Sequence, residues 1–269
     1  NQKNCASLAT GKVTNTRTMK PNSNSSISVT QFRGFTLVEM LVVVAIIGIL
    51  VTITVPFVSR AMIKSKVATA RTDMINLKGA VQSYQNDYSR FPSGRGAAPN
   101  FKGGDLTYHL PIGRKHADGS PQDAGNWSDP PVTPDNNVVM AILMAIDYGA
   151  NKNHGRNPKK TTYLTPNTAD DKFSAGVGPD GVFRDPFGNP YVISVDLAGD
   201  ENVADLFYRE TGVSKGASIG LVRNVDNKTE EEYVLRGSVM IWSPGPDRQV
   251  NSKAGALAKE NTDNILGWR

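Results

Sequence analysis

The chain has 269 residues, with 30 Lys or Arg against 25 Asp or Glu, and its formal net charge is +5. All of that excess lies in residues 1–34, which hold five basic residues and no acidic one. The basic balance therefore indicates no nucleic-acid interface, because such an interface needs a basic patch that persists on the functional chain. The single cysteine, Cys5, lies in the same segment, so the rest of the chain has no disulfide to stabilise it.

Residues 1–34 read as a polar, basic leader ahead of an apolar run. Basic residues before an apolar segment hold their side in the cytoplasm and send the C-terminal bulk of the chain across the membrane. Met19 begins a segment that ends at Gly34 and has the length and polarity of a leader. We expect Met19 to be the true translation start.

The apolar run extends from Phe35 to Val58 and contains one acidic residue, Glu39. Roughly 20 apolar residues cross a bilayer at a rise of about 1.5 Å per residue, so residues 35–58 are predicted to form a membrane helix. Pro56 is expected to kink or loosen this helix. A secretory signal peptide and an uncut anchor are the alternatives, but the run exceeds a signal core and no small-residue cleavage site follows it.

The six residues from Gly34 to Glu39, Gly-Phe-Thr-Leu-Val-Glu, resemble the signature of the type IV filament proteins, which comprise type IV pilins and the pseudopilins of type II secretion. The resemblance implies that a membrane peptidase cuts after Gly34 and that the new amine of Phe35 is N-methylated. It also implies that Glu39 pairs with the Phe35 amine of a neighbouring subunit and sets the axial register of a filament. A carboxylate in a spanning helix needs such a partner, since the positive end of the helix dipole compensates its burial only weakly.

Beyond the apolar run, apolar residues recur at alternating spacings of four and three, which is one helical stripe. They are Ile63, Val67, Ala70, Met74, Leu77, Val81, Tyr84, Tyr88 and Phe91. The pattern predicts one helix over residues 35–90, with an amphipathic half at 59–91. We expect the stripe to lie on a sheet of the same chain, and a coiled-coil partner is the alternative.

Residues 92–135 are rich in Gly, Pro, Asn and Asp and are predicted to form loops. Thr133 is expected to cap a short packing helix whose first residue is Pro134. Gly149 is expected to end that helix.

The last third of the chain has the Gly- and Asn-punctuated apolar runs of antiparallel strands. The predicted strands are Tyr191–Val195, Ile219–Val225, Glu232–Leu235 and Val239–Trp242. A long helix followed by such strands predicts an α+β fold of the type IV pilin kind, in which the helix packs on a small antiparallel sheet. Residues 92–269 are expected to form one globular domain.

The segment from Asp185 to Tyr191, Asp-Pro-Phe-Gly-Asn-Pro-Tyr, resembles the segment that leads into the first sheet strand of the major pseudopilin. The alternative is a tight turn, which would also account for its Pro and Gly residues.

The C-terminal segment resembles the calcium loop of the same pseudopilins, and oxygen-rich flexible loops suit calcium. The ligands that the resemblance implies are Asp247, Asn251, Asp263 and Asn264. The chain departs from that pattern in two places: Arg248 stands where Gly is common, and residues 252–260 insert two lysines that weaken cation binding. An Asp- and Asn-rich turn without metal is the alternative.

Signals of catalysis are weak. Gly216–Gly220 matches Gly-x-Ser-x-Gly, but a nucleophile elbow needs a buried strand before it and a helix after it. His109, His116 and His154 lie in loop-like sequence without metal-ligand spacing and are expected at the surface. The sequence therefore predicts no enzyme.

The resemblance implies a prepilin that polymerises into a type II secretion pseudopilus and drives protein export from the inner membrane, with its globular domain in the periplasm. The partners it implies are the prepilin peptidase and methylase, other copies and pilin-like subunits, and an inner-membrane assembly platform. A surface pilin for adhesion, motility or DNA uptake is one alternative. A membrane-anchored binding module that never polymerises is the other.

Overall fold

The computed structural model describes residues 34–99, 105–109, 133–224 and 232–269, and the chain divides into two compact units at Thr52 and Ile53. The first helix, α1, spans Leu37–Tyr88 and continues through Pro56 without a break. The predicted helix is thereby confirmed, although it neither begins at residue 35 nor reaches residue 90.

The second unit contains the strands and the shorter helices, and an α+β fold is confirmed. The elements after α1 are β1 (Leu106–Tyr108), α2 (Asn137–Leu143), a 3-10 segment η1 (Gly149–His154), β2 (Gly176–Val177), β3 (Phe183–Arg184), β4 (Val192–Val195), β5 (Asn202–Ala204), α3 (Thr211–Ser214), β6 (Val222–Asn224), β7 (Glu232–Arg236), β8 (Val239–Ser243) and β9 (Ile265–Leu266).

The central sheet is antiparallel, with strand order β1-β4-β8-β9, and its middle pair places Val192 opposite Trp242 and Val195 opposite Val239. A three-stranded sheet of order β5-β7-β6 and the β2–β3 hairpin accompany it. The strands predicted near residues 191, 232 and 239 are confirmed, whereas the strand predicted over 219–225 is shorter.

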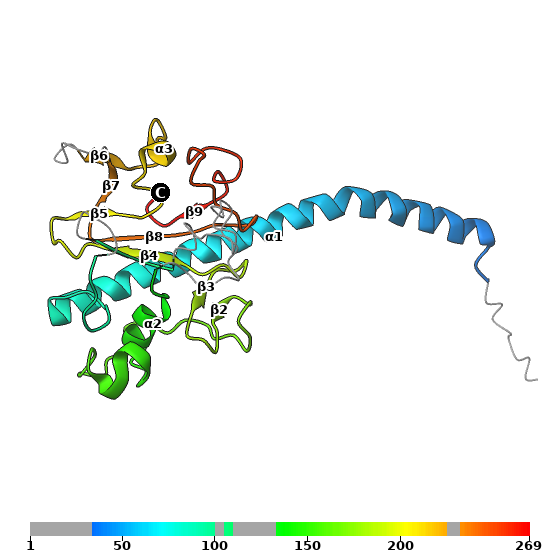
Figure 1. Ribbon diagram of the computed structural model, residues 1–269. Coiled ribbons are helices and arrows are strands. Elements are labelled where there is room, and N and C mark those ends of the chain that lie inside the picture. Colours follow the sequence, from blue (N-terminus) through cyan, green and yellow to red (C-terminus); the bar gives the residue numbers. More distant parts are fainter. Residues whose placement is uncertain (1–33, 100–104, 110–132, 225–231) are drawn as a thin grey trace, which may run out of the picture. The chain divides into compact units, whose positions relative to one another are not determined.

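The amphipathic half of α1 lies on one face of the central sheet (Figure 1). Ala70, Met74, Leu77, Val81 and Tyr84 are all buried in one cluster with residues of β4, β8 and α2. The stripe therefore packs on a sheet of its own chain, as predicted, and it loses its burial toward Ile63, which is exposed.

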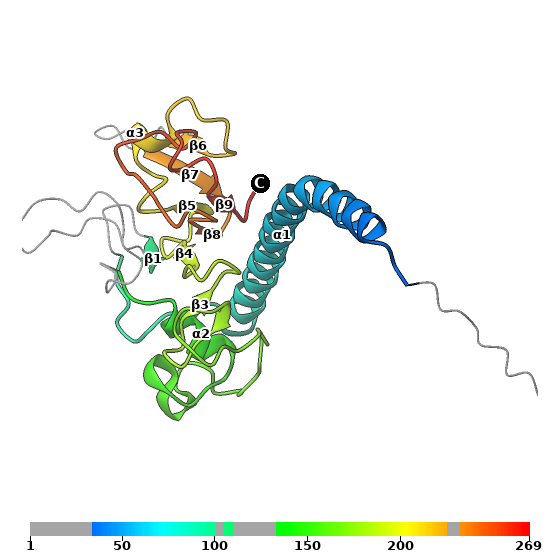
Figure 2. The ribbon, with the colours of Figure 1, turned by 90° about the vertical axis from the view of Figure 1, so that its right-hand side faces the viewer.

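The opposite face of the same sheet is covered as well, because strand side chains alternate between faces. Ile193 and Ile241 face α1, whereas Val192 and Trp242 join a second cluster with Phe207. Figure 2 shows α2 and the β2–β3 hairpin at the end of this unit away from β5, β6 and β7.

Three expectations for the connecting segments are wrong. Residues 92–135 are not all loop, since β1 lies among them and pairs with β4. The helix expected at Thr133 begins at Asn137 instead, because the buried Asn136 side chain bonds the backbone of Phe183 and Tyr191 and thereby positions the helix start.

Helix α2 also ends earlier than Gly149. Ala145 adopts a left-handed conformation with φ of 56°, and the amides of Ala145 and Ile146 return to the carbonyls of Ile142 and Ala141. This is a Schellman ending with Ala in the place that Gly usually takes.

His109 is buried rather than exposed, with its Nδ1 2.7 Å from the Asp135 carboxylate. Cys5 and His116 lie outside the described residues.

Candidate functional site: the start of helix α1 and the C-terminal loop

The start of α1 is an exposed, extended segment followed by a capped helix. Gly34, Phe35 and Thr36 precede the helix and are all exposed. Thr36 caps it: the Thr36 backbone amide and hydroxyl donate to the Glu39 carboxylate at 2.8 and 2.9 Å, and the Glu39 amide donates to the Thr36 hydroxyl at 3.2 Å. This reciprocal pattern is a capping box. Within the chain, Glu39 therefore already has a role in the helix start.

The first part of α1 exposes a continuous apolar surface. Its large apolar residues from Leu37 to Val58 are all exposed. Among the described residues, α1 is the one helix long and apolar enough to cross a membrane, and none of its most apolar 18-residue window is buried. Exposed apolar surface of this extent marks a site for lipid or protein partners.

The Asp185–Tyr191 segment is a tight turn that leads into β4. Asp185 Oδ1 accepts the amides of Phe187 and Asn189, each at 2.8 Å, while Oδ2 accepts the Ser243 hydroxyl at the end of β8. Burial raises the pKa of Asp185. The strand that follows is not the first of the sheet, since β1 precedes it in the chain. The carboxylate thus both shapes the turn and ties it to the neighbouring strand.

The same turn holds the C-terminal loop. Asn189 donates to the carbonyl of Gly245 at 2.7 Å, and Arg248 donates to the carbonyl of Phe187. Gly245 has φ of 76°, and a Cβ there would collide with the carbonyl oxygen of Asp263. Arg248 has φ of 60°, a conformation that Gly adopts more easily. The departure from the family pattern at Arg248 therefore falls at a backbone position that favours Gly.

The structure brings together two of the four residues predicted to bind calcium. The Asp247 amide donates to the Asp263 carboxylate at 3.0 Å. Burial and the nearby negative charge of Asp247 raise the pKa of Asp263. Asp263 Oδ1 and Asn264 Oδ1 are buried oxygens without a hydrogen-bond donor in the described part of the chain.

Asn251 lies in a different arrangement. Its side-chain oxygen accepts the Lys253 amide at 3.0 Å, and its backbone bonds the side chain of Asn261. The described residues contain no group of three or more His, Cys, Asp or Glu side chains placed to hold a metal ion. A cation here would therefore need amide and backbone oxygens beside Asp247 and Asp263, a mixed oxygen set that calcium accepts.

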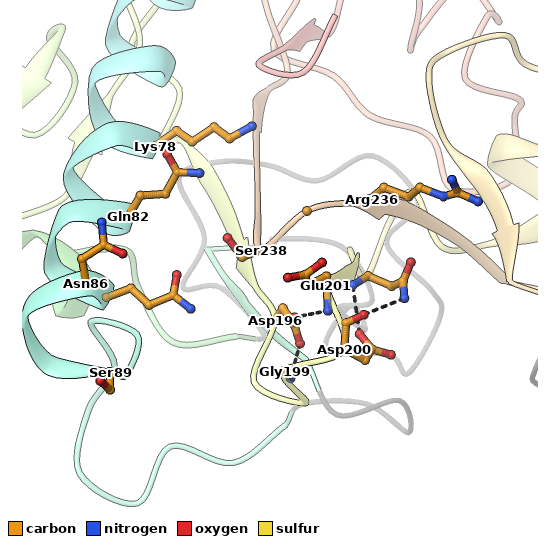
Figure 3. Close-up of a pocket in the computed structure, with 13 residues that line it drawn as sticks. Lys78, Gln82, Asn86, Ser89, Asp196, Gly199, Asp200, Glu201, Arg236 and Ser238 are labelled. Atoms are coloured by element: carbon orange, nitrogen blue, oxygen red, sulfur yellow. Dashed lines mark hydrogen bonds between the residues drawn. The ribbon is translucent and has the colours of Figure 1, made fainter.

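A polar groove of about 1130 Å³ lies between α1 and the turns that connect the strands (Figure 3). Lys78, Gln82 and Asn86 line it from α1, and Asp196 and Glu201 line it from the β4–β5 turn. None of these residues was identified from the sequence. Their spacing of four along the helix, beside the buried stripe, is the one local signal of a shared face.

Asp105 lies close to the acidic turn of this groove. Its side chain accepts the amide of Ala204 at 2.7 Å and is buried. Burial, with the charges of Asp196 and Asp200, raises its pKa to about 7. The group therefore titrates near neutral pH.

Comparison with known proteins identifies similarity over about a quarter of the chain. A family model described as the prokaryotic N-terminal methylation motif matches residues 30–55. Over 61 residues the chain is 38% identical to the type II secretion system core protein G of Klebsiella pneumoniae. These 61 residues are 23% of this chain and 44% of that protein.

Two relatives have pilin or fimbrial names. The type IV major pilin protein PilA of Myxococcus xanthus is 41% identical over 70 residues, or 25% of this chain and 32% of that protein. The fimbrial protein EcpC of Eikenella corrodens is 38% identical over 66 residues, or 24% of this chain and 43% of that protein. The chain thus spans less than half the length of these relatives, and no solved structure matches it significantly.

Proposed function

Because the chain carries the N-terminal segment shared by type IV pilins and type II secretion pseudopilins, we propose that it is a prepilin-like structural subunit that polymerises into a pseudopilus. The observation that carries this proposal is the apolar, exposed first part of α1 with Glu39 near its start. Its work is mechanical: subunits added at the inner membrane extend a short filament that pushes exported proteins outward. We propose no catalytic activity.

Assembly follows from the chemistry of the helix start. Cleavage after Gly34 by a prepilin peptidase frees the amine of Phe35, and methylation keeps that amine positively charged. The apolar surface of α1 packs against the same surface of other copies, and Glu39 of one copy meets the Phe35 amine of the next. The charge pair compensates a carboxylate that apolar surroundings otherwise disfavour, and so selects one axial register.

The C-terminal domain then lies on the periplasmic side of the inner membrane, which the exposed apolar helix and the basic leader support. The further partners are the methylase, other pilin-like subunits and an inner-membrane assembly platform. These assignments rest on similarity over about a quarter of the chain.

A surface type IV pilin is the second candidate, and the similarity to PilA and EcpC favours it. The turn at Asp185–Tyr191 and the lack of any cysteine beyond Cys5 favour the pseudopilus. If the chain forms neither kind of filament, it is a membrane-anchored binding module that does not polymerise.

We also propose that the C-terminal loop binds calcium through Asp247 and Asp263, with Asn264 as a further oxygen donor. Two buried oxygens without donors and a pair of adjacent carboxylates support this proposal. Asn251 is the weakest member of the predicted set, because its side-chain oxygen already accepts a backbone amide.

The test is mass spectrometry of the N-terminal peptide from two fractions of the native host, sheared surface filaments and washed membranes. A peptide beginning with methylated Phe35 confined to the membranes supports the pseudopilus. The same peptide in abundant sheared filaments identifies a surface pilin. An uncut leader contradicts both filament functions and leaves an anchor.

A further inference from the structure

Exposed cations follow the apolar part of α1 directly. Arg60, Lys64, Lys66 and Arg71 lie within the thirteen residues after Val58, and all four are exposed. No Asp or Glu occurs between Glu39 and Asp73. In the proposed orientation these cations lie on the far side of the membrane, where basic residues are normally not enriched. Their presence there therefore calls for a specific partner.

Three of the four cations share one face of the helix. At about 3.6 residues per turn, Arg60, Lys64 and Arg71 lie within roughly 40° of one another around the axis. We call these three residues the basic stripe. No described ion pair involves any of them, and the nearest following acid, Asp73, accepts the hydroxyl of Tyr191 at 3.0 Å on another side of the helix. The stripe is thus an uncompensated row of positive charge.

Lys66 differs from the stripe. It lies roughly 120° from Arg60 around the helix, and its ammonium group is 5.3 Å from the centroid of the Phe187 ring. A cation over an aromatic face is partly satisfied there. Lys66 therefore provides a control of equal charge on the same turn of the helix.

The depth of the stripe fits the headgroup layer of a bilayer. At a rise of about 1.5 Å per residue, Arg60 lies about 3 Å and Lys64 about 9 Å beyond Val58. The polar layer on each side of a bilayer is roughly 5–8 Å thick. Arg60 and Lys64 therefore fall in or beside that layer. Arg71, about 20 Å beyond Val58, lies past it and lines a cavity beside the C-terminal loop with Asn261 and Asn264.

Resting on the proposed function, we propose that the basic stripe binds the phosphate groups of anionic phospholipids in the outer leaflet of the inner membrane. Arg60 and Lys64, two cations on one face at headgroup depth and without acids nearby, select phosphatidylglycerol over zwitterionic lipids. This contact holds a subunit at a defined height before it is assembled. Entry into a filament replaces the lipid contacts of the stripe.

The experiment uses the full chain in nanodiscs, with Cys5→Ser and a dye at Ala61→Cys beside the stripe. Quenching of the dye by spin-labelled phosphatidylglycerol is compared with quenching by equally labelled phosphatidylcholine. We expect roughly two- to threefold stronger quenching by phosphatidylglycerol, falling toward equality at high salt. Lys64→Gln should weaken the difference, whereas Lys66→Gln, which removes the same charge from another face of the helix, should preserve it. The triple variant Arg60→Gln, Lys64→Gln, Arg71→Gln should abolish it.

Equal quenching by the two lipids in the labelled chain without substitutions in the stripe overturns the proposal, as does a preference that survives in the triple variant. If the triple variant keeps the lipid preference but fails to assemble, the stripe instead contacts acidic groups of a second copy. Because the readout reports single subunits, it is independent of polymerisation. Glu39→Ala, which tests filament assembly, should leave the lipid preference unchanged.

Discussion

The Glu39 carboxylate accepts hydrogen bonds from both the backbone amide and the hydroxyl of Thr36, at 2.8 and 2.9 Å. Two roles therefore meet in one side chain, the helix cap seen within the chain and the proposed charge pair with a second copy. Substitutions can separate them, because Gln completes a capping box as Glu does but carries no charge.

Glu39→Gln should leave the helix intact and reduce filament assembly at least about tenfold, as expected for loss of the charge pair between copies. Thr36→Val removes the capping hydroxyl but keeps the carboxylate, and should retain assembly. Both are measured as the fraction of cleaved subunit that sediments with filaments. Normal assembly of Glu39→Gln together with loss of assembly in Thr36→Val would show that Glu39 acts as a cap alone.

The packing of α1 on the sheet predicts a large difference between two neighbouring helix positions. Leu77 is fully buried in the core cluster, whereas Ile75 is 65% exposed. Leu77→Ala should lower the free energy of unfolding by about 2–5 kcal/mol through lost burial and a residual cavity. Ile75→Ala should change it by less than about 0.5 kcal/mol. Urea unfolding of the full chain in detergent compares them, and similar costs would contradict the packing described.

The left-handed Ala145 predicts a stabilising substitution. The left-handed conformation costs an L-residue other than Gly roughly 1–2 kcal/mol of folding free energy. Gly avoids this cost, but its more flexible unfolded chain lowers stability by about 0.4–1 kcal/mol. Ala145→Gly should therefore stabilise the domain by about 0.5–1 kcal/mol. The matched reverse change, Gly149→Ala at φ of 52°, should destabilise it. Thermal unfolding of both variants measures the pair, and a destabilised Ala145→Gly variant would be inconsistent with this helix ending.

Asp105 predicts a pH dependence of stability. Its pKa is raised in the folded chain to about 7, against about 3.9 for an unfolded Asp, so the folded state holds a proton that the unfolded state releases. The stability that Asp105 contributes to the folded state is thus fully present below about pH 4 and is lost as the pH rises through 7. Asp105→Asn should flatten this part of the stability curve and stabilise the domain above pH 7. Unfolding measured from pH 4 to 8 tests this, and parallel curves for the two proteins would refute it.

Calcium should raise the unfolding temperature if the C-terminal loop binds it. At a calcium concentration one hundred times the dissociation constant, the expected stabilisation is about 2.7 kcal/mol. Asp263→Asn should remove the effect, whereas Asp170→Asn, at an exposed position outside the predicted ligand set, should keep it. Differential scanning calorimetry with calcium, with magnesium and with a chelator makes the comparison. If calcium does not change the unfolding temperature, the loop is an Asp- and Asn-rich turn that binds no calcium.

The sequence predicted those elements whose signal is local. The stripe of α1 can be predicted because consecutive apolar residues are three or four positions apart. The strands β4, β7 and β8 can be predicted because they are apolar runs bounded by turn residues. In contrast, β1 has three residues and β9 has two, and both exist because a partner strand from a distant part of the chain pairs with them.

The start of α2 was mispredicted for a similar reason. Thr133 and Pro134 have the local features of a helix start, but the three hydrogen bonds of Asn136 to residues around β3 and β4 determine where the helix begins. Tertiary contacts thus override a local cap preference.

The site residues divide in the same way. Asp247 and Asp263 lie together as the calcium prediction requires, while Asn251 turns to a local backbone amide. The titrating Asp105 was not identified, because its raised pKa depends on residues about 90 to 100 positions away in the chain. Burial of this kind leaves no pattern in the sequence around it.

The extended stretch before α1 has a consequence for maturation. The bond that follows Gly34 lies outside the helix, and the cap that begins the helix, Thr36 with Glu39, belongs wholly to the chain that remains after the proposed cut. A cut there would therefore need no unwinding of the helix, and removal of the residues before it would leave the hydrogen bonds of the helix start in place. The proposed cut would exchange a neutral amide for a cation beside an intact helix cap, so one new charge, without refolding of the helix start, would make a subunit competent for the proposed assembly.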